Sequence, residues 1–177
     1  MAVVLIGGGA RSGKSRFALE YAEARFTRRA FVATAQPLDS EMAERIRQHQ
    51  QDRGTGWTAI EAPLDLVGAL SRETGEFDVL VVDCLTMWLS NVLLDAERNA
   101  EEEIDSLIQC LSGCGTLSVV LVTNEVGSGI VPDNELARKF RDLAGVLNQR
   151  VARAADEVYW MAFGIPVAVK TASGEST

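Results

Sequence analysis

The sequence predicts an α/β protein in which helices cover both faces of a mostly parallel β-sheet. Apolar, strand-like runs recur along the chain, separated mostly by helical patterns, at residues 2–6, 30–34, 78–83, 117–123 and 158–163. Residues 79–82 and 119–122 are continuously apolar, which is typical of central strands buried on both sides. A length of 177 residues with 47% hydrophobic content is enough for one buried core.

The first predicted strand leads directly into a glycine-rich loop. Residues 3–6 read Val-Val-Leu-Ile, and the residues that follow match the pattern of a glycine, any four residues, Gly, Lys and Ser/Thr. The matching positions are Gly8, Gly13, Lys14 and Ser15. A segment rich in helix formers comes next, so the loop connects a strand to a helix. This context favours the three-layer fold of P-loop NTPases over an ordinary glycine-rich turn.

Each residue type in the loop suits phosphate binding. Glycines let several backbone N–H groups approach one anion closely, and the N-terminus of the following helix adds a positive dipole end. We expect Lys14 to reach the terminal phosphates and act in catalysis, and the Ser15 hydroxyl to bind Mg²⁺. The predicted phosphate-binding residues are Gly8, Gly9, Ala10, Arg11, Ser12, Gly13, Lys14 and Ser15.

Two carboxylates follow the apolar runs that we expect to flank or neighbour the phosphate-loop strand. Asp83 ends the run at 79–82, where P-loop proteins often place a carboxylate that binds Mg²⁺ directly or through water. The alternative is that Asp83 caps the next helix. Glu125 follows the run at 119–122 and is a candidate base for phosphoryl transfer to an alcohol, although a purely structural loop would explain it equally well.

The C-terminal third predicts a long helix and a hairpin. Asp133 and Asn134 can cap a helix from about Asn134 to Ala155. Its predicted core stripe is Leu136, Phe140, Leu143, Leu147 and Val151. Residues 166–170 follow the run at 158–163 too closely for a parallel crossover, so an antiparallel pair is expected. Residues 1–170 are predicted to form one domain, and 171–177 a short polar tail.

Composition excludes several classes of protein. The net charge of −8 and the pI near 4.7 argue against nucleic acid as the principal partner. No apolar run approaches membrane-spanning length, and no signal peptide is present, so we expect no membrane insertion. The three cysteines, Cys84, Cys110 and Cys114, lack a paired metal-binding spacing, which favours reduced thiols and a cytoplasmic location.

The one histidine, His49, lies in a polar segment with helical composition. Met42, Ile46, His49 and Arg53 are spaced so that they share one helix face. Considered alone, a histidine among Arg and Gln residues is most simply a solvated surface residue.

His49 is also part of a wider pattern of six segments that spans nearly the whole chain. One of them reads Arg45-Ile46-x-x-His49-x-x-x-Arg53-x-x-x-Trp57-x-x-x-Glu61, and the others are Gly8–Ser15, Ala33–Gln36, Asp83–Asn91, Thr123–Pro132 and Ala137–Gly145. Together they resemble the bifunctional adenosylcobinamide kinase and adenosylcobinamide-phosphate guanylyltransferase family. One departure is Gly54, which stands where the family usually has proline.

The resemblance implies an enzyme of cobalamin biosynthesis and salvage that catalyses two reactions. It phosphorylates the aminopropanol hydroxyl of adenosylcobinamide with ATP or GTP, and then transfers GMP from GTP to that phosphate, releasing pyrophosphate. By the same resemblance, His49 attacks the α-phosphate of GTP and carries GMP, while Mg²⁺ and the phosphate loop hold the pyrophosphate. Neutral imidazole suits this role because its unperturbed pKa is about 6.5.

The resemblance also implies further nucleotide-binding residues and a homotrimer. The additional residues are Ala33, Thr34, Ala35, Gln50, Gln51, Asp52, Arg53, Glu61 and Asp83. Two alternatives remain open at this point. The chain could be a P-loop small-molecule kinase without a covalent intermediate, or a binding module in which the triphosphate orders the loop at 125–129.

Overall fold

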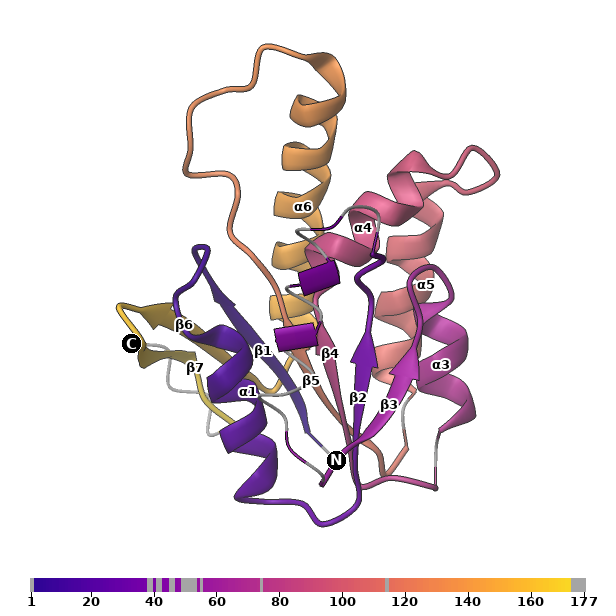
Figure 1. The fold of residues 1–177 in the computed structure, drawn as a ribbon, viewed down its shortest axis with the longest axis vertical. Coiled ribbons are helices and arrows are strands. Elements are labelled where there is room, and N and C mark those ends of the chain that lie inside the picture. Colours follow the sequence, from indigo (N-terminus) through magenta and orange to yellow (C-terminus); the bar gives the residue numbers. More distant parts are fainter. Residues whose placement is uncertain are drawn as a thin grey trace.

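The computed structural model describes residues 2–37, 40, 43–44, 47–48, 54, 56–73, 75–113 and 115–172. Within these residues, one sheet has the strand order β3-β2-β4-β5-β1-β6-β7 (Figure 1). The strands are β1 (Val3–Gly8), β2 (Arg29–Ala33), β3 (Thr58–Glu61), β4 (Val79–Asp83), β5 (Ser118–Val122), β6 (Glu157–Ala162) and β7 (Ile165–Lys170). All neighbouring strands pair in parallel except β6 and β7, which are antiparallel. The predicted mostly parallel sheet and its terminal hairpin are therefore confirmed.

Helices cover both faces of the sheet, as the sequence predicts. The described helices are α1 (Lys14–Glu23), α3 (Leu66–Arg72), α4 (Leu85–Leu94), α5 (Ala100–Ser112) and α6 (Glu135–Ala154). Helix α1 packs against β1, β4 and β5, while α3 to α6 pack together on the other side (Figure 1). Neighbouring residues of β1 show how one strand serves both layers. Val3 and Leu5 join the core under α3 to α6, and Val4 and Ile6 join the core under α1.

The sheet differs from the sequence-based expectation in two respects, which are one additional strand and the order of the central strands. Strand β3 has no counterpart among the predicted strands because three of its four residues are exposed, so it lacks an apolar signature. Of the two central runs, only β5 lies beside the phosphate-loop strand β1; β4 is one strand further away, and the other neighbour of β1 is β6. Continuous burial identifies central strands but does not determine their order.

Helix α6 begins close to the predicted position. The Asn134 side chain accepts a hydrogen bond from the Ala137 N–H (2.7 Å), as expected of a cap. The predicted core stripe is wrong at Leu136, which is 50% exposed, whereas Phe140 is half-buried and packs against the core. Leu143, together with residues 147 and 151, is buried. The first turn of α6 extends beyond the end of the sheet in Figure 1, which agrees with the exposure of Leu136.

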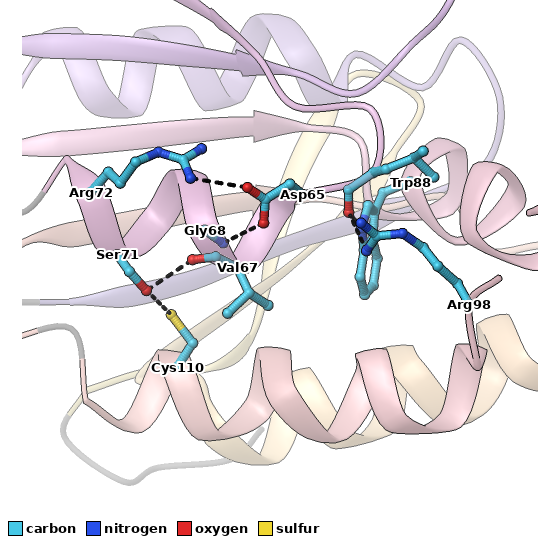
Figure 2. Close-up of polar contacts among 9 residues, drawn as sticks. Asp65, Val67, Gly68, Ser71, Arg72, Trp88, Arg98 and Cys110 are labelled. Atoms are coloured by element: carbon cyan, nitrogen blue, oxygen red, sulfur yellow. Dashed lines mark hydrogen bonds and ion pairs between the residues drawn. The ribbon is translucent and has the colours of Figure 1, made fainter.

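Polar contacts cap α3 and connect the segment before it to α4 (Figure 2). The Asp65 carboxylate caps α3 by accepting from the Gly68 N–H (3.0 Å), and it also pairs with Arg72. The Leu64 carbonyl accepts from the Trp88 indole N–H (3.0 Å), and thereby connects the segment before α3 to α4. None of the described helices is long and apolar enough to cross a lipid bilayer.

Candidate nucleotide site

The glycine-rich loop connects β1 to α1 with the backbone geometry that its sequence predicts. Gly8 and Gly13 have φ values of 148° and 92°, a region that L side chains rarely adopt. A Cβ at Gly8 would also lie 2.9 Å from the Met161 carbonyl oxygen of β6. Gly13 is the N-cap of α1, so the positive end of that helix faces the loop. Gly8 to Ser15 therefore form a strand–loop–helix connection whose backbone geometry suits an anion.

The Lys14 ammonium group lies within this loop. It donates to the Gly9 carbonyl (2.5 Å) and approaches the Ser12 hydroxyl (3.4 Å), and the residue is only 7% exposed. Burial lowers the pKa of Lys14, while the nearby Cys84 and Asp83 oppose that shift. Lys14 is thus a buried cation near the acidic end of β4.

Asp83 is the last residue of β4, as the sequence predicts. In the sheet register, it pairs with Ala33 of β2 on one side and with Val122 of β5 on the other. The helix after Asp83 is capped at Cys84 without a side-chain hydrogen bond, so Asp83 is not the cap of that helix. Asp83 therefore lies at the edge of the sheet where the phosphate loop begins.

Three other predicted nucleotide-binding residues, Ala33 to Ala35, lie at the end of β2. Thr34 is fully buried, and its hydroxyl donates to the Cys84 carbonyl (2.9 Å) and accepts from the Cys84 N–H (2.8 Å). Thr34 thus holds the backbone immediately after Asp83. Its side chain is engaged with protein groups, so a contact with nucleotide would come from the neighbouring backbone or from Ala33 and Ala35.

Glu61 lies further from the phosphate loop. It ends β3, which is an edge strand of the sheet, and β2, β4 and β5 separate β3 from β1. At a spacing of about 4.8 Å per strand, the two ends are about 19 Å apart across the sheet. At this separation Glu61 and the phosphate loop do not contact each other directly. Residues His49, Gln50, Gln51, Asp52 and Arg53 lie outside the described residues.

Glu125 lies beside the phosphate loop but is engaged locally. Its backbone N–H donates to the Gly8 carbonyl (3.1 Å), while its side-chain Oε1 accepts from the Gly127 N–H (2.5 Å). Proximity to Gly8 agrees with a place in the site. The bond to Gly127 also gives Glu125 a structural function in the loop, the alternative that the sequence left open.

A cluster of hydrogen-bonded polar residues surrounds Asn124, and it is not among the predicted site residues. The Asn124 amide donates to the Thr86 hydroxyl (3.0 Å), and the Asn148 amide of α6 donates to the Asn124 carbonyl (3.2 Å). The Asn91 amide of α4 donates to the carbonyls of Thr34 (2.8 Å) and Pro63 (3.0 Å), which follow β2 and β3. The sequence does place Thr34, Thr123 and Asn124 directly after apolar strands. Polar residues at such positions indicate a hydrogen-bonded cluster at the end of the sheet.

The loop after β5 extends beside the upper part of α6 in Figure 1. Between them lies an open groove of about 430 Å³. Its lining residues are Gly127, Gly129, Val131, Arg141, Asp142, Gly145, Val146 and Gln149. The groove is separate from the glycines and lysine of the phosphate loop.

The fold and the loop together define a nucleotide-binding protein of the P-loop α/β class. Solved structures agree on the fold. The RadB recombinase matches with a TM-score of 0.52 at 15% identity, over 90% of this chain and 73% of that one. The assembled type III secretion ATPase EscN of enteropathogenic E. coli matches with a TM-score of 0.57 at 9% identity, over 94% of this chain and 47% of that one. These identities indicate a shared fold only.

Within that class, the chain belongs to the cobinamide kinase / cobinamide phosphate guanyltransferase family, whose model matches residues 4–169. Two relatives bear the name bifunctional adenosylcobalamin biosynthesis protein. CobU of Salmonella typhimurium is 41% identical, with 95% of this chain and 99% of that protein covered. CobP of Pseudomonas aeruginosa is also 41% identical, with 94% and 96% covered.

Proposed function

We propose that this protein phosphorylates adenosylcobinamide with ATP or GTP and then transfers GMP from GTP to the resulting phosphate. The products of the second reaction are adenosylcobinamide-GDP and pyrophosphate. The observation that carries the proposal is membership of a family that combines both activities, in a chain whose phosphate loop has the geometry needed for nucleotide binding.

In the kinase reaction, the backbone N–H groups of the loop and the Lys14 ammonium group bind and orient the phosphates. Their positive charge lies where negative charge accumulates during phosphoryl transfer. Because Lys14 is buried, water screens its charge less than it would at the surface. The acceptor hydroxyl loses a proton in this step, and Glu125 is our candidate acceptor because its backbone contacts Gly8.

Mg²⁺ fits the donor set at this edge of the sheet. Ser15 follows Lys14 in the first turn of α1, and the Asp83 carboxylate is close enough to influence the pKa of Lys14. A hydroxyl and a carboxylate are hard oxygen ligands, and Mg²⁺ on nucleotides commonly takes one or two protein ligands beside phosphates and water. When bound, the ion would neutralise charge on the phosphates. Ser15 and Asp83 would hold it.

In the guanylyl transfer, we propose that His49 is the nucleophile. Its imidazole nitrogen bonds to the α-phosphorus of GTP while the bond to the β-phosphate oxygen breaks, so pyrophosphate leaves. The cobinamide phosphate oxygen then attacks the same phosphorus and releases the histidine. Residues 50–53, Ala33 to Ala35 and Glu61 complete the proposed nucleotide site. Arg53 offers a planar, permanently charged group for a phosphate.

Labelling with GTP carrying a radioactive α-phosphate tests the histidine step. In the presence of Mg²⁺, we expect GMP on the His49 peptide through a bond that is labile in acid and stable in alkali. His49→Ala should abolish labelling and GMP transfer but retain phosphorylation of adenosylcobinamide, whereas Lys14→Ala should weaken both reactions. Equal retention of both activities in His49→Ala would support the alternative, a P-loop kinase without a covalent intermediate.

A homotrimer and a cytoplasmic location complete the proposal. Both come from the sequence: the trimer from the family resemblance, and the location from the cysteine pattern. Sedimentation equilibrium of the purified protein measures the first directly, because a trimer has three times the 19.1 kDa chain mass.

A further inference from the structure

A cluster of hydrogen bonds meets at Asn124, between the phosphate loop and the end of β4. Asn124 follows β5, which lies between β4 and β1 in the sheet. Its side-chain amide donates to the Thr86 hydroxyl (3.0 Å) and contacts the Cys84 sulfur (3.8 Å). Both partners belong to the segment that begins directly after Asp83. The Asn124 side chain therefore attaches to the part of the chain that carries the proposed metal-side carboxylate.

The backbone on either side of Asn124 attaches to the other half of the site. The Thr123 N–H donates to the Ile6 carbonyl (3.0 Å), and the Glu125 N–H donates to the Gly8 carbonyl (3.1 Å). Gly8 is the first residue of the phosphate-binding pattern. The tripeptide 123–125 is thus fixed to the phosphate loop through its backbone and to the Asp83 segment through one amide side chain.

Asn148 of α6 fixes this tripeptide from a third side. Its amide donates to the Asn124 carbonyl (3.2 Å), and its side-chain oxygen accepts from the Thr123 hydroxyl (2.7 Å). Thr86 and Thr123 are 4% and 2% exposed, so each of their bonds to an asparagine has one buried end and is partly shielded from water. Shielded bonds in a connected network restrict motion more than exposed ones, because breaking one leaves a buried polar group without a partner.

We propose that Asn124 is a positioning residue, which sets the distance between the phosphate loop and Asp83 for the transfer reactions. The proposal rests on the function proposed above. Asn124 acts through its own bond to Thr86 and through the bond of the adjoining Glu125 N–H to Gly8, and it does not need to contact substrate. Its importance follows from the sensitivity of group transfer to geometry, since a misplacement of about 1 Å can cost on the order of 100-fold in rate.

A purely structural role predicts a different pattern of effects. If the cluster only satisfied buried polar groups, its loss would lower stability and leave the turnover of the folded enzyme unchanged. A positioning role predicts that kcat falls while the KM for nucleotide changes little, because the phosphate loop itself remains intact.

The decisive experiment compares Asn124→Ala with Asn134→Ala in the full-length protein, using the phosphorylation of adenosylcobinamide. Asn134 caps α6, and within the described part of the chain its hydrogen bonds go to residues 137 and 138 and not to the cluster, so its variant is a control that loses stability without disturbing the site. We expect kcat to fall on the order of 10- to 100-fold in Asn124→Ala and to stay within about twofold in Asn134→Ala, with KM nearly unchanged in both.

Two further variants, both at Thr86, test whether the hydrogen bond between Asn124 and Thr86 is responsible for the effect. Thr86→Val removes the acceptor of the Asn124 amide and should reproduce the loss of kcat, whereas Thr86→Ser should restore it. The double variant Asn124→Ala/Thr86→Val should be no slower than either single variant, because both remove the same connection. An unchanged kcat in Asn124→Ala, or an equal fall in Asn134→Ala, overturns the proposal.

A measurement without substrate keeps this proposal distinct from the proposed function. In NMR spectra of the free protein, Asn124→Ala should shift the amide resonances of residues 8–14 and of Asp83 together, and Asn134→Ala should shift neither. If the wild-type protein failed to phosphorylate adenosylcobinamide, the proposed function would fail, and these spectra would still decide the positioning role. Shifts confined to residues 84–86 would reject it.

Discussion

The Thr34 hydroxyl satisfies both backbone groups of Cys84, accepting from its N–H (2.8 Å) and donating to its carbonyl (2.9 Å). Thr34 follows β2 and Cys84 follows β4, so one side chain joins the ends of two neighbouring strands. Cys84 is 7% exposed, which means that water cannot replace these bonds easily. The backbone next to Asp83 is consequently held by a hydroxyl group from another strand.

Thr34→Val should therefore destabilise the protein while preserving side-chain shape. A buried backbone group without a partner costs about 1–3 kcal/mol, and this variant removes the partner of two such groups. Urea unfolding should show a free energy of unfolding lower by about 2 kcal/mol or more. Thr34→Ser keeps the hydroxyl and is the control. Equal stability of the valine variant and the wild type would show that the two bonds contribute nothing.

The phosphate loop offers a second prediction that rests on a pair of adjacent glycines. Gly8 has a φ of 148° and no room for a Cβ, whereas a Cβ at Gly9 would meet nothing within 4 Å. We expect Gly8→Ala to lower the free energy of unfolding by about 1–3 kcal/mol and to weaken nucleotide binding. Gly9→Ala should leave the free energy of unfolding within about 0.5 kcal/mol of the wild-type value.

Calorimetry of nucleotide binding, together with thermal unfolding, distinguishes these two variants. Both replace glycine by alanine in the same loop, so the added methyl group and the change in chain entropy are matched. If Gly8→Ala and Gly9→Ala behaved alike, the conformation of Gly8 and its proximity to Met161 would not explain the requirement for glycine.

The parts of the fold that the sequence predicts are those with a local signature. The motif from Gly8 to Ser15 specifies a loop between a strand and a helix, and the short gap before residue 166 specifies a hairpin; both are present. Strand β3 could not be predicted in this way, because it is an exposed edge strand that depends on pairing with β2. Local patterns do not record such tertiary pairing.

The same distinction applies to the candidate site. The positions of Lys14, Ser15 and Asp83 could be predicted, because they follow from a motif and from the end of an apolar strand, while their roles stay predictions. Asn124 and Asn148 could not, because their partners are 38 and 24 residues away in the sequence and meet only in the folded chain. An isolated asparagine has too many possible functions to be assigned without its partners.

A pH-dependent loss of stability should arise from Tyr21. Burial, assisted by the Glu157 carboxylate, raises the pKa of Tyr21 from 10.0 to about 12. The folded state therefore keeps this phenol protonated when the unfolded chain has begun to release the proton. The resulting stabilisation is complete below pH 10 and is lost as the pH rises through about 12.

Urea unfolding between pH 9 and pH 12 measures this effect. Tyr21→Phe removes the titrating group but keeps the ring, which packs against Phe17 and Tyr159. We expect the free energy of unfolding to fall less steeply with pH in the variant than in the wild type. Parallel curves would assign the alkaline loss of stability to other groups, such as Tyr159, whose pKa is also raised by burial.

Lys170 should stabilise the contact between the terminal hairpin and α6. Its ammonium group extends from β7 to the end of α6, where it donates to the carbonyls of Arg153 (3.2 Å) and Ala155. The last carbonyls of a helix lack partners within the helix and carry the negative end of its dipole, so a cation there is favourable. Lys170→Met should cost about 1 kcal/mol of stability.

Hydrogen exchange of the β7 amides locates this effect better than global unfolding alone. In Lys170→Met, the amides of residues 165 and 167–170 should exchange several-fold faster than in the wild type, because the hairpin loses its attachment to α6. Lys139→Met is the matched control, since Lys139 is an exposed lysine in the first half of α6. Equal exchange rates at β7 in the two variants would mean that β6 alone holds the terminal strand in place.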